Sequence, residues 1–257
     1  MDGTNYDTGF YADIAEAENS HFWFRHRAAA ARHVLEKHIA GKKCRRLLEV
    51  GAGTCYMARY ISKSARGAEI VCTDLNAQGL RIGKSAGNIM AAVADLASNP
   101  FKVKFDVICM FDVLEHIGDD MAMLSSARQC LAEDGALLLT VPAGPSLWSD
   151  FDVASGHKRR YTGKELEKKL ELAGLRKVFA SHLFSFLVPL MRVSRRKKAS
   201  GAEETAARAR RQLHPPAVLN FMLSLASGME MMMMKAGARI PFGTSIIAAA
   251  VPREKPI

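Results

Sequence analysis

The chain has 257 residues and 49% hydrophobic content, enough to bury the core of one large domain, or of one domain with an appendage. Its five cysteines include no CxxC pair, which excludes a disulfide framework and favours buried thiols in a reducing compartment. Because the first 18 residues are acidic and polar, they do not read as a secretory signal, and we expect a cytoplasmic protein.

The positive charge is unevenly distributed. The net charge is +10, and residues 180–240 alone hold ten Lys and Arg against three acids. The rest of the chain is therefore only mildly basic, and the basic character belongs to one late segment.

The N-terminal segment 19–27, NSHFWFRHR, contains three aromatic residues and leads into an alanine-rich helix predicted at about 28–39. Two interpretations remain open. Either the aromatic face docks this helix onto the core, or Trp23, Phe24 and Arg25 form a lid beside a ligand.

Residues 47–55, LLEVGAGTC, read as a short apolar strand that glycines interrupt, and a helical pattern resumes at Tyr56. Such a unit opens many nucleotide-binding folds, because glycine lets the backbone approach a ligand beside free helix N–H groups. Dinucleotide sites have a third glycine where this chain has Tyr56. Glu49, at the strand end, would repel a pyrophosphate but suit a cation. The turn therefore favours a ligand with a ribose and a positive charge over NAD.

Further strands and helices alternate along the chain. Strands are predicted at 69–73, 89–94, 105–111, 135–142, 175–180 and 243–251, and helices at 77–85, 119–131 and 163–173. Continuous apolar runs such as DVICMF indicate strands that are covered on both sides. The pattern predicts an α/β fold with a mostly parallel sheet and helices on both faces.

Acidic residues follow four of the predicted strands. Glu49, Asp74, Asp95 and Asp112 fall at or next to strand C-termini. Because ligands of such sheets bind beyond the carboxyl ends, we expect these acids to line one rim. Asp74 lies 21 residues after Gly53, where an acid accepts hydrogen bonds from ribose hydroxyls.

Five segments together resemble, in order and spacing, the motifs of class I S-adenosylmethionine-dependent methyltransferases: EVGAGTC, TDLN, ADLASNPF, FDVICMFDVLEHI and LAEDGALLLTVP. The HFWFR, GHKRRYT and PFGTSI stretches resemble its type 11/23-like branch. The resemblance implies a Rossmann-like, seven-stranded, mostly parallel sheet with an antiparallel last strand and a helical insertion between strands 6 and 7. It also implies S-adenosyl-L-methionine as cofactor and S-adenosyl-L-homocysteine as product.

The family resemblance assigns the methionine end of the cofactor to the glycine turn. Glu49, Gly51 and Gly53 match the motif that holds this end. Phe111 and Asp112 match the segment that runs beneath the cofactor.

The ribose and adenine are assigned to later strand ends. Asp74 matches the ribose-binding acid, with Leu75 beside the adenine. Asp95 and Leu96 match the pair at the adenine edge. The chain departs from the family at Cys55, where a third glycine is usual, so Cys55 should stiffen the loop and approach the ligand.

The catalytic candidates lie in the loop after the fifth strand. A base is needed only if the acceptor keeps its proton at neutral pH, and His157 and Asp152 are the titratable candidates. Arg159, Arg160 and Tyr161 would hold an anionic acceptor or shape the pocket, with Tyr161 completing the predicted catalytic set. Alternatively, these side chains brace the loop against the sheet. His116 is interpreted as a packing residue, and no metal site is predicted.

We expect four segments: an N-terminal lid and helix (1–43), a cofactor-binding core (44–180), a basic and apolar helical insertion (181–240), and the final strand with the tail (241–257). Residues 217–234 carry one charge, Glu230, and approach the minimum length of a membrane span. They form either a cap on the core or, with the basic runs, a surface for an anionic bilayer or an amphipathic substrate.

The sequence thus predicts a methyltransferase for a small-molecule or lipid-like acceptor, cytoplasmic or peripheral at the inner face of a membrane. An RNA methyltransferase that uses the basic insertion is an alternative, but the segment has no RNA-binding signature, so no nucleic-acid partner is expected. A non-catalytic S-adenosylmethionine-binding protein is a further alternative. The oligomeric state and the acceptor atom are not indicated.

Overall fold

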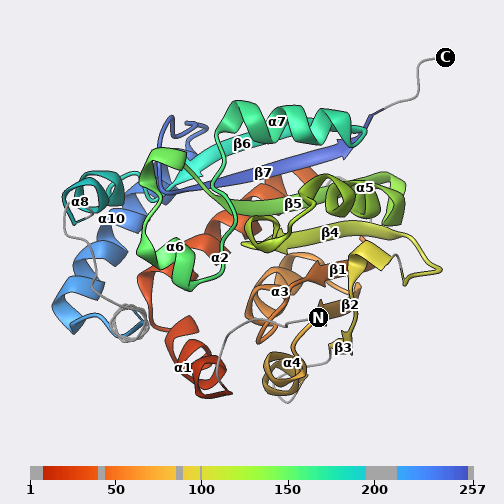
Figure 1. Cartoon of the computed structure of the whole chain (residues 1–257), viewed down its shortest axis with the longest axis horizontal. Coiled ribbons are helices and arrows are strands. Elements are labelled where there is room, and N and C mark those ends of the chain that lie inside the picture. Colours follow the sequence, from red (N-terminus) through yellow and green to blue (C-terminus); the bar gives the residue numbers. More distant parts are fainter. Residues whose placement is uncertain (1–7, 40–43, 85–88, 99, 195–212, 254–257) are drawn as a thin grey trace.

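The structure is a computed structural model that describes residues 8–39, 44–84, 89–98, 100–194 and 213–253. A seven-stranded sheet runs through its centre in the order β3-β2-β1-β4-β5-β7-β6 (Figure 1). The strands are β1 (Arg46–Val50), β2 (Glu69–Asp74), β3 (Met90–Val93), β4 (Phe105–Phe111), β5 (Leu131–Pro142), β6 (Leu175–Leu183) and β7 (Ser245–Pro252).

The strand directions place all carboxyl ends of the parallel strands at one edge. Strand pairs from β3 to β5 are parallel, whereas β7 runs antiparallel to both β5 and β6. Val50 of β1 is level with Thr73 of β2 and Met110 of β4. We call this edge the carboxyl edge. The predicted Rossmann-like sheet with an antiparallel last strand is confirmed.

Helices cover both faces of the sheet. They are α1 (Thr8–Glu18), α2 (Phe22–Val34), α3 (Tyr56–Ile61), α4 (Ala77–Lys84), α5 (Asp120–Cys130), α6 (Asp150–Ala154), α7 (Gly163–Leu172), α8 (Leu187–Ser194) and α10 (Ala217–Lys235). Leu47 packs with residues of α2 and α3, whereas its neighbour Leu48 packs with residues of α5 and α7. Both sides of β1 are therefore core, which explains its uninterrupted apolar run.

The predicted alanine-rich helix is α2, and it begins at Phe22 rather than near residue 28. His21 caps it, because its Nδ1 accepts a hydrogen bond of 3.1 Å from the backbone N–H of Trp23. Phe22 and Phe24 are buried, so the aromatic residues belong to the helix and dock it onto the core. After Val34 the helix widens into a π-helical turn.

The strand boundaries differ from the predictions at one pairing irregularity. β4 has the predicted bounds, but β5 begins at Leu131 rather than Gly135. Phe105 pairs with Leu131 and Val107 with Ala136, so β5 bulges between these positions. A bulge of this kind leaves no clear signal in the apolar pattern.

The segment between β6 and β7 contributes α8 and α10 to the carboxyl-edge end of the molecule (Figure 1). The basic runs at 195–198 and 208–211 lie outside the described residues. By length and composition alone α10 is apolar enough to cross a membrane. However, its buried face carries Glu230, which lies 2.8 Å from His26 Nε2 on α2. The helix is therefore attached to the core along one face.

Candidate active site

The turn after β1 adopts a left-handed backbone at three positions, Gly51, Gly53 and Cys55. A Cβ atom on Gly51 would lie 2.6 Å from Val113 Cγ2, so only glycine fits there. Cys55 adopts φ +57° with a fully buried side chain, a conformation that costs a non-glycine residue about 1–2 kcal/mol. The predicted departure from the family motif is thus a locally strained position.

Asp74, at the end of β2, fastens this turn. Its Oδ2 accepts a hydrogen bond of 2.8 Å from the backbone N–H of Gly53, and its Oδ1 accepts one of 2.8 Å from Asn76. Burial raises the pKa of Asp74, although these backbone hydrogen bonds oppose the shift. The next side chain, Leu75, is 55% exposed. The strand end thus presents a carboxylate beside an uncovered apolar side chain.

Glu49 lies beneath the turn rather than on its surface. It is 2% exposed, and its Oε2 accepts a hydrogen bond of 2.7 Å from the backbone N–H of Ala58, in the first turn of α3. Burial raises the pKa of Glu49 well above its ordinary value, and the nearby Cys55 adds to this. The carboxylate therefore positions α3 and the turn from below.

Asp95 and Leu96 follow β3 but point differently. Asp95 is exposed, and its Oδ1 accepts a hydrogen bond of 2.9 Å from Ala97 N–H, which caps the short 3-10 helix Leu96–Ser98. The side chain of Leu96 is buried in the core. Only the backbone of Leu96 is left to meet a ligand.

Asp112 forms an ion pair with Arg27, a residue that the sequence analysis did not identify as part of the site. Phe111 is buried at the end of β4, and Asp112 follows in a left-handed conformation. Thr140 Oγ1 donates a hydrogen bond of 3.0 Å to Asp112 Oδ1, and Arg27 of α2 forms an ion pair with Oδ2. The Arg27 guanidinium also lies 4.4 Å from the ring centroid of Trp23. The sequence does hold one signal for Arg27. Residues four apart on a helix lie on the same face, so Arg27 would be expected beside Trp23 if the helix included both.

The aromatic residues of α2 support the docking interpretation over the lid. Trp23 stacks on Phe184 at 5.6 Å with ring planes 12° apart, and Phe24 is 8% exposed. Arg25 is exposed, and Arg27 rather than Arg25 reaches the carboxyl edge.

A second group that sequence reasoning missed joins α1 to the glycine turn. Glu18, at the end of α1, is buried and accepts a hydrogen bond from Thr54 Oγ1. Arg59 donates a hydrogen bond of 2.7 Å to the Thr54 carbonyl. Burial raises the pKa of Glu18, against the effects of Thr54 and the nearby arginines. The turn is thus held from above by α1 as well as from below by Glu49.

The loop between β5 and α7, residues 143–162, carries the catalytic candidates, and we call it the β5–α7 loop. Asp152 is fully buried, and its Oδ1 lies 2.9 Å from His157 Nδ1 and 2.7 Å from Arg160 Nε. Burial alone would raise the pKa of Asp152, but the His157 and Arg160 contacts outweigh it and lower the pKa to about 2. A carboxylate so weakly basic is a poor general base. Its position instead orients His157.

Tyr161, predicted to complete the catalytic set, packs in the hydrophobic core. It is fully buried, and its hydroxyl donates a hydrogen bond of 2.9 Å to Asp120 Oδ2. Burial, together with Asp120, raises the pKa of Tyr161 above its ordinary value. Arg159 pairs with the same Asp120 at 2.8 Å, and Arg160 is 7% exposed. The contacts of these three residues hold the loop against the rest of the fold.

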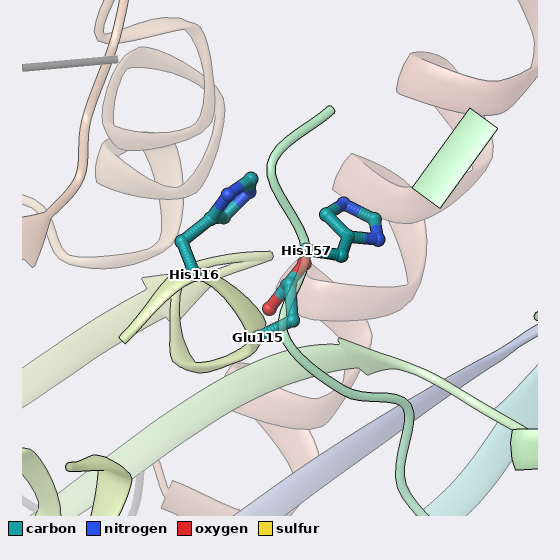
Figure 2. Close-up of side chains that lie close together, drawn as sticks. All are labelled: Glu115, His116 and His157. Atoms are coloured by element: carbon teal, nitrogen blue, oxygen red, sulfur yellow. The ribbon is translucent and has the colours of Figure 1, made fainter. Parts of the chain in front are cut away.

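His157 meets two residues of the turn after β4. Glu115 and His116 lie on the 3-10 helix η4 (Leu114–His116), and the backbone N–H of Lys158 donates a hydrogen bond of 2.7 Å to the Glu115 carbonyl. The rings of His116 and His157 meet edge-on, with their centroids 4.8 Å apart, and the side chain of Glu115 lies below them in Figure 2. Burial, with some effect from His157, lowers the pKa of His116 to about 4. His116 therefore packs against His157 of the β5–α7 loop.

Comparison with known sequences now identifies the chain. Residues 23–179 match the family described as Methyltransferase domain. The chain belongs to the methyltransferase domain family. It is a class I S-adenosylmethionine-dependent methyltransferase, and S-adenosylmethionine is its cofactor. No curated protein sequence matches it.

Solved structures share the fold of this methyltransferase. A chain from the complex of the Haloferax volcanii Trm112 methyltransferase activator is 14% identical, with TM-score 0.63, covering 97% of this chain and 96% of that one. An S-adenosylmethionine-dependent methyltransferase from Clostridium acetobutylicum is 11% identical, with TM-score 0.55 and coverages of 89% and 92%. The [4+2]-cyclase SpnF is 17% identical, with TM-score 0.58 and coverages of 88% and 81%. The fold therefore does not by itself fix the reaction.

The carboxyl edge of this methyltransferase fits its cofactor in composition. The turn at Gly51 has no room for a Cβ, and the carboxylate of Asp74 stands beside the exposed Leu75. A hollow of about 380 Å³ elsewhere on the molecule is lined by Cys44, Asp106 and Val251, among others. That hollow lies at the amino ends of the parallel strands, away from these residues, so it is not where this fold binds ligands.

Proposed function

We propose that this methyltransferase transfers a methyl group to a small-molecule or amphipathic acceptor that approaches the carboxyl edge between the β5–α7 loop and α10. The observation that carries the proposal is the apolar outer face of α10, which lies at the same end of the molecule as the β5–α7 loop (Figure 1). S-adenosylmethionine supplies an activated methyl group, and the protein mainly aligns donor and acceptor.

The proposed cofactor contacts follow the strand ends. Gly51 and Gly53 let the backbone approach the methionine end, and Glu49 holds their turn in place from below. Asp74 would accept hydrogen bonds from the ribose hydroxyls, with Leu75 against the adenine.

The remaining contacts lie beside the adenine and beneath the cofactor. Asp95 would accept from the adenine amine, and Leu96 would contribute its backbone, since its side chain is buried. Phe111 and Asp112 would lie beneath the cofactor, with Asp112 held by Arg27.

On the acceptor side, His157 is the proposed catalytic residue. Its Nδ1 is occupied by Asp152, so its other nitrogen, Nε2, is the one that remains to meet an acceptor proton. Asp152 acts through His157 as a positioning residue, because it is fully buried itself.

The outer face of α10 suggests where the acceptor comes from. Val218, Met222, Leu225, Met229 and Met232 are each more than half exposed and recur at three- and four-residue intervals. They form a stripe about 21 Å long. An uninterrupted apolar stripe of this length is typical of a helix that lies in a lipid interface. With the basic residues of segment 181–240, it favours an anionic bilayer at the inner face of a membrane.

A labelling experiment tests the acceptor class. The full chain is incubated with S-adenosylmethionine carrying a tritiated methyl group and with separated lipid and RNA fractions of the same cells. We expect label in the lipid-soluble fraction. Label in RNA alone would establish the RNA alternative, and no transfer despite cofactor binding would establish the non-catalytic one.

Vesicle binding tests whether the apolar outer face of α10 binds a membrane. We expect the chain to partition to phosphatidylglycerol vesicles more than to phosphatidylcholine vesicles. The double variant Leu225→Ser/Met229→Ser should weaken binding by about tenfold per side chain. Leu172→Ser is the matched control, because Leu172 is equally exposed but lies near the start of β6, at the opposite edge. Equal partition of the double variant and the parent would contradict the proposal that α10 binds an anionic bilayer.

A further inference from the structure

Three side chains able to bind a metal converge at the carboxyl edge. Glu115 and His116 come from η4, and His157 comes from the β5–α7 loop (Figure 2). One ligand atom of each lies within 4.8 Å of the others. Ligand atoms held at about 2.1 Å by a tetrahedral zinc ion are about 3.4 Å apart. Small side-chain rotations would therefore bring the three atoms into the coordination range of one ion.

The carboxylate of Glu115 is the strongest indication of a missing partner. The residue is fully buried, yet neither carboxylate oxygen has a hydrogen-bond partner among the described residues. A buried carboxyl of this kind is costly unless a cation occupies the space before it.

Both histidines are arranged as ligands. The His157–Asp152 hydrogen bond of 2.9 Å occupies Nδ1 and leaves Nε2 for an ion. Arg160 and Ser149 in turn hold Asp152. A carboxylate behind a histidine is the arrangement that orients imidazole ligands in metal proteins. His116 supplies the second imidazole of the cluster, and its ring meets that of His157 edge-on.

We propose that Glu115, His116 and His157 bind a divalent transition-metal cation, of the class to which Zn²⁺ belongs. Two imidazoles and one carboxylate are a donor set of catalytic zinc sites, and imidazole ligands favour transition metals over Mg²⁺ or Ca²⁺. Three protein ligands leave at least one position open. Glu115 is buried whereas both histidines are partly exposed, so the open position faces the carboxyl edge.

A cation in this place would hold an acceptor oxygen beside the proposed methyl donor. His157 would then act as a ligand, and the ion rather than a free imidazole would lower the pKa of the acceptor. This role rests on the proposed function, whereas the binding of the ion does not.

Calorimetric titration with Zn²⁺ tests the site. The full chain, without a polyhistidine tag, carries Cys44→Ser, because Cys44 is the one cysteine of the five that is not buried. We expect one bound equivalent. Glu115→Gln and His157→Asn should each lower the affinity at least tenfold, and Asp152→Asn should lower it about 10- to 100-fold. His38→Gln, which alters a histidine that belongs to the π-helical turn after α2 and lines the hollow at the amino ends of the parallel strands, is the control and should bind Zn²⁺ as the parent does.

Thermal unfolding gives a second readout that does not depend on activity. Zn²⁺ should raise the melting temperature of the parent but not that of Glu115→Gln, while the metal-free Glu115→Gln variant should melt no lower than the metal-free parent. Zn²⁺ binding that survives both Glu115→Gln and His157→Asn would overturn the proposal, as would binding of Mg²⁺ but not Zn²⁺. Binding of S-adenosylhomocysteine by the same variants reports separately on the cofactor site, so failure of the two proposals can be distinguished.

Discussion

Arg27 of α2 forms an ion pair with Asp112, the residue that follows β4, and its guanidinium also stacks on Trp23. The side chains are 11% and 19% exposed, so the pair is largely shielded from solvent. The pair fixes α2 to the carboxyl edge at the point where the cofactor is expected to lie.

Replacing Arg27 should therefore affect both stability and cofactor binding. Arg27→Ala leaves the Asp112 carboxylate without its cation, and we expect a loss of about 3 kcal/mol in the free energy of unfolding in urea. Affinity for S-adenosylhomocysteine should fall in parallel. Arg32→Ala is the control, because the Arg32–Glu36 pair is well exposed and should contribute less than about 1 kcal/mol. Equal losses in the two variants would contradict the assignment.

The buried contact between α10 and α2 predicts a pH-dependent stability. Glu230 is 3% exposed and accepts hydrogen bonds from His26, Phe184 and Ser185. Glu230→Ala should destabilise the chain by about 4 kcal/mol at pH 7, measured by urea unfolding. Glu69→Ala, which removes a pair on the exposed start of β2, should cost less than about 1 kcal/mol.

The sign of the pH effect follows from the direction of the shift. Burial alone would raise the pKa of Glu230, but the hydrogen bonds from His26 and Ser185 hold it below its ordinary value of 4.5. The unfolded chain then binds the proton more readily, so this stabilisation is present above pH 4.5 and is lost as pH falls through the folded-state pKa. The difference between the parent and Glu230→Ala should therefore shrink below pH 4.5. A constant difference down to pH 3 would contradict this.

Gly79 of α4 packs so closely against the glycine turn after β1 that a larger residue there should disturb the turn. A Cβ on Gly79 would lie 2.6 Å from the carbonyl oxygen of Gly53, a backbone atom that cannot rotate away. Gly79→Ala should destabilise the chain by about 1–2 kcal/mol in thermal melts, since overpacking exceeds the helix-propensity gain of alanine. Gly228→Ala, on α10, meets nothing within 4 Å and should instead stabilise by up to about 1 kcal/mol. The opposite signs make the comparison decisive.

Asp74 predicts the largest effect on cofactor affinity. Asp74→Ala removes the acceptor of the Gly53 and Asn76 N–H groups as well as the proposed ribose contact. We expect affinity for S-adenosylhomocysteine to fall about 100-fold, measured by calorimetry. Asp95→Ala should lower it about tenfold, because one contact is lost. Retention of the parent affinity by Asp74→Ala would show that the ribose lies elsewhere.

The sheet was largely predictable because its signals are local. The apolar run at Phe105–Phe111 is bounded by polar residues and covered on both sides, so its limits can be read from the sequence. The beginning of α2 could not be read in this way. Its aromatic residues stay on the helix because they pack against Phe184, a contact between segments far apart in the chain.

The acceptor side was harder to predict because the role of each residue there depends on the direction in which its side chain points. Tyr161 and His157 belong to the same loop, yet a bridge between Ala143 and Tyr161 turns Tyr161 into the core. Sequence spacing does not indicate which way a loop side chain faces. The approach of Glu115 to His157 likewise depends on the packing of η4 against the β5–α7 loop.

His26 and Arg27 are consecutive residues of α2, and they serve different neighbours. The first contacts Glu230 of α10, and the second contacts Asp112 at the carboxyl edge. An α-helix turns by about 100° per residue, so one short helix presents both contacts on adjoining sides. Grafting the β6–β7 insertion onto another enzyme of this fold would therefore require transplanting α2 with it, since the recipient would otherwise lack the histidine to which α10 is attached.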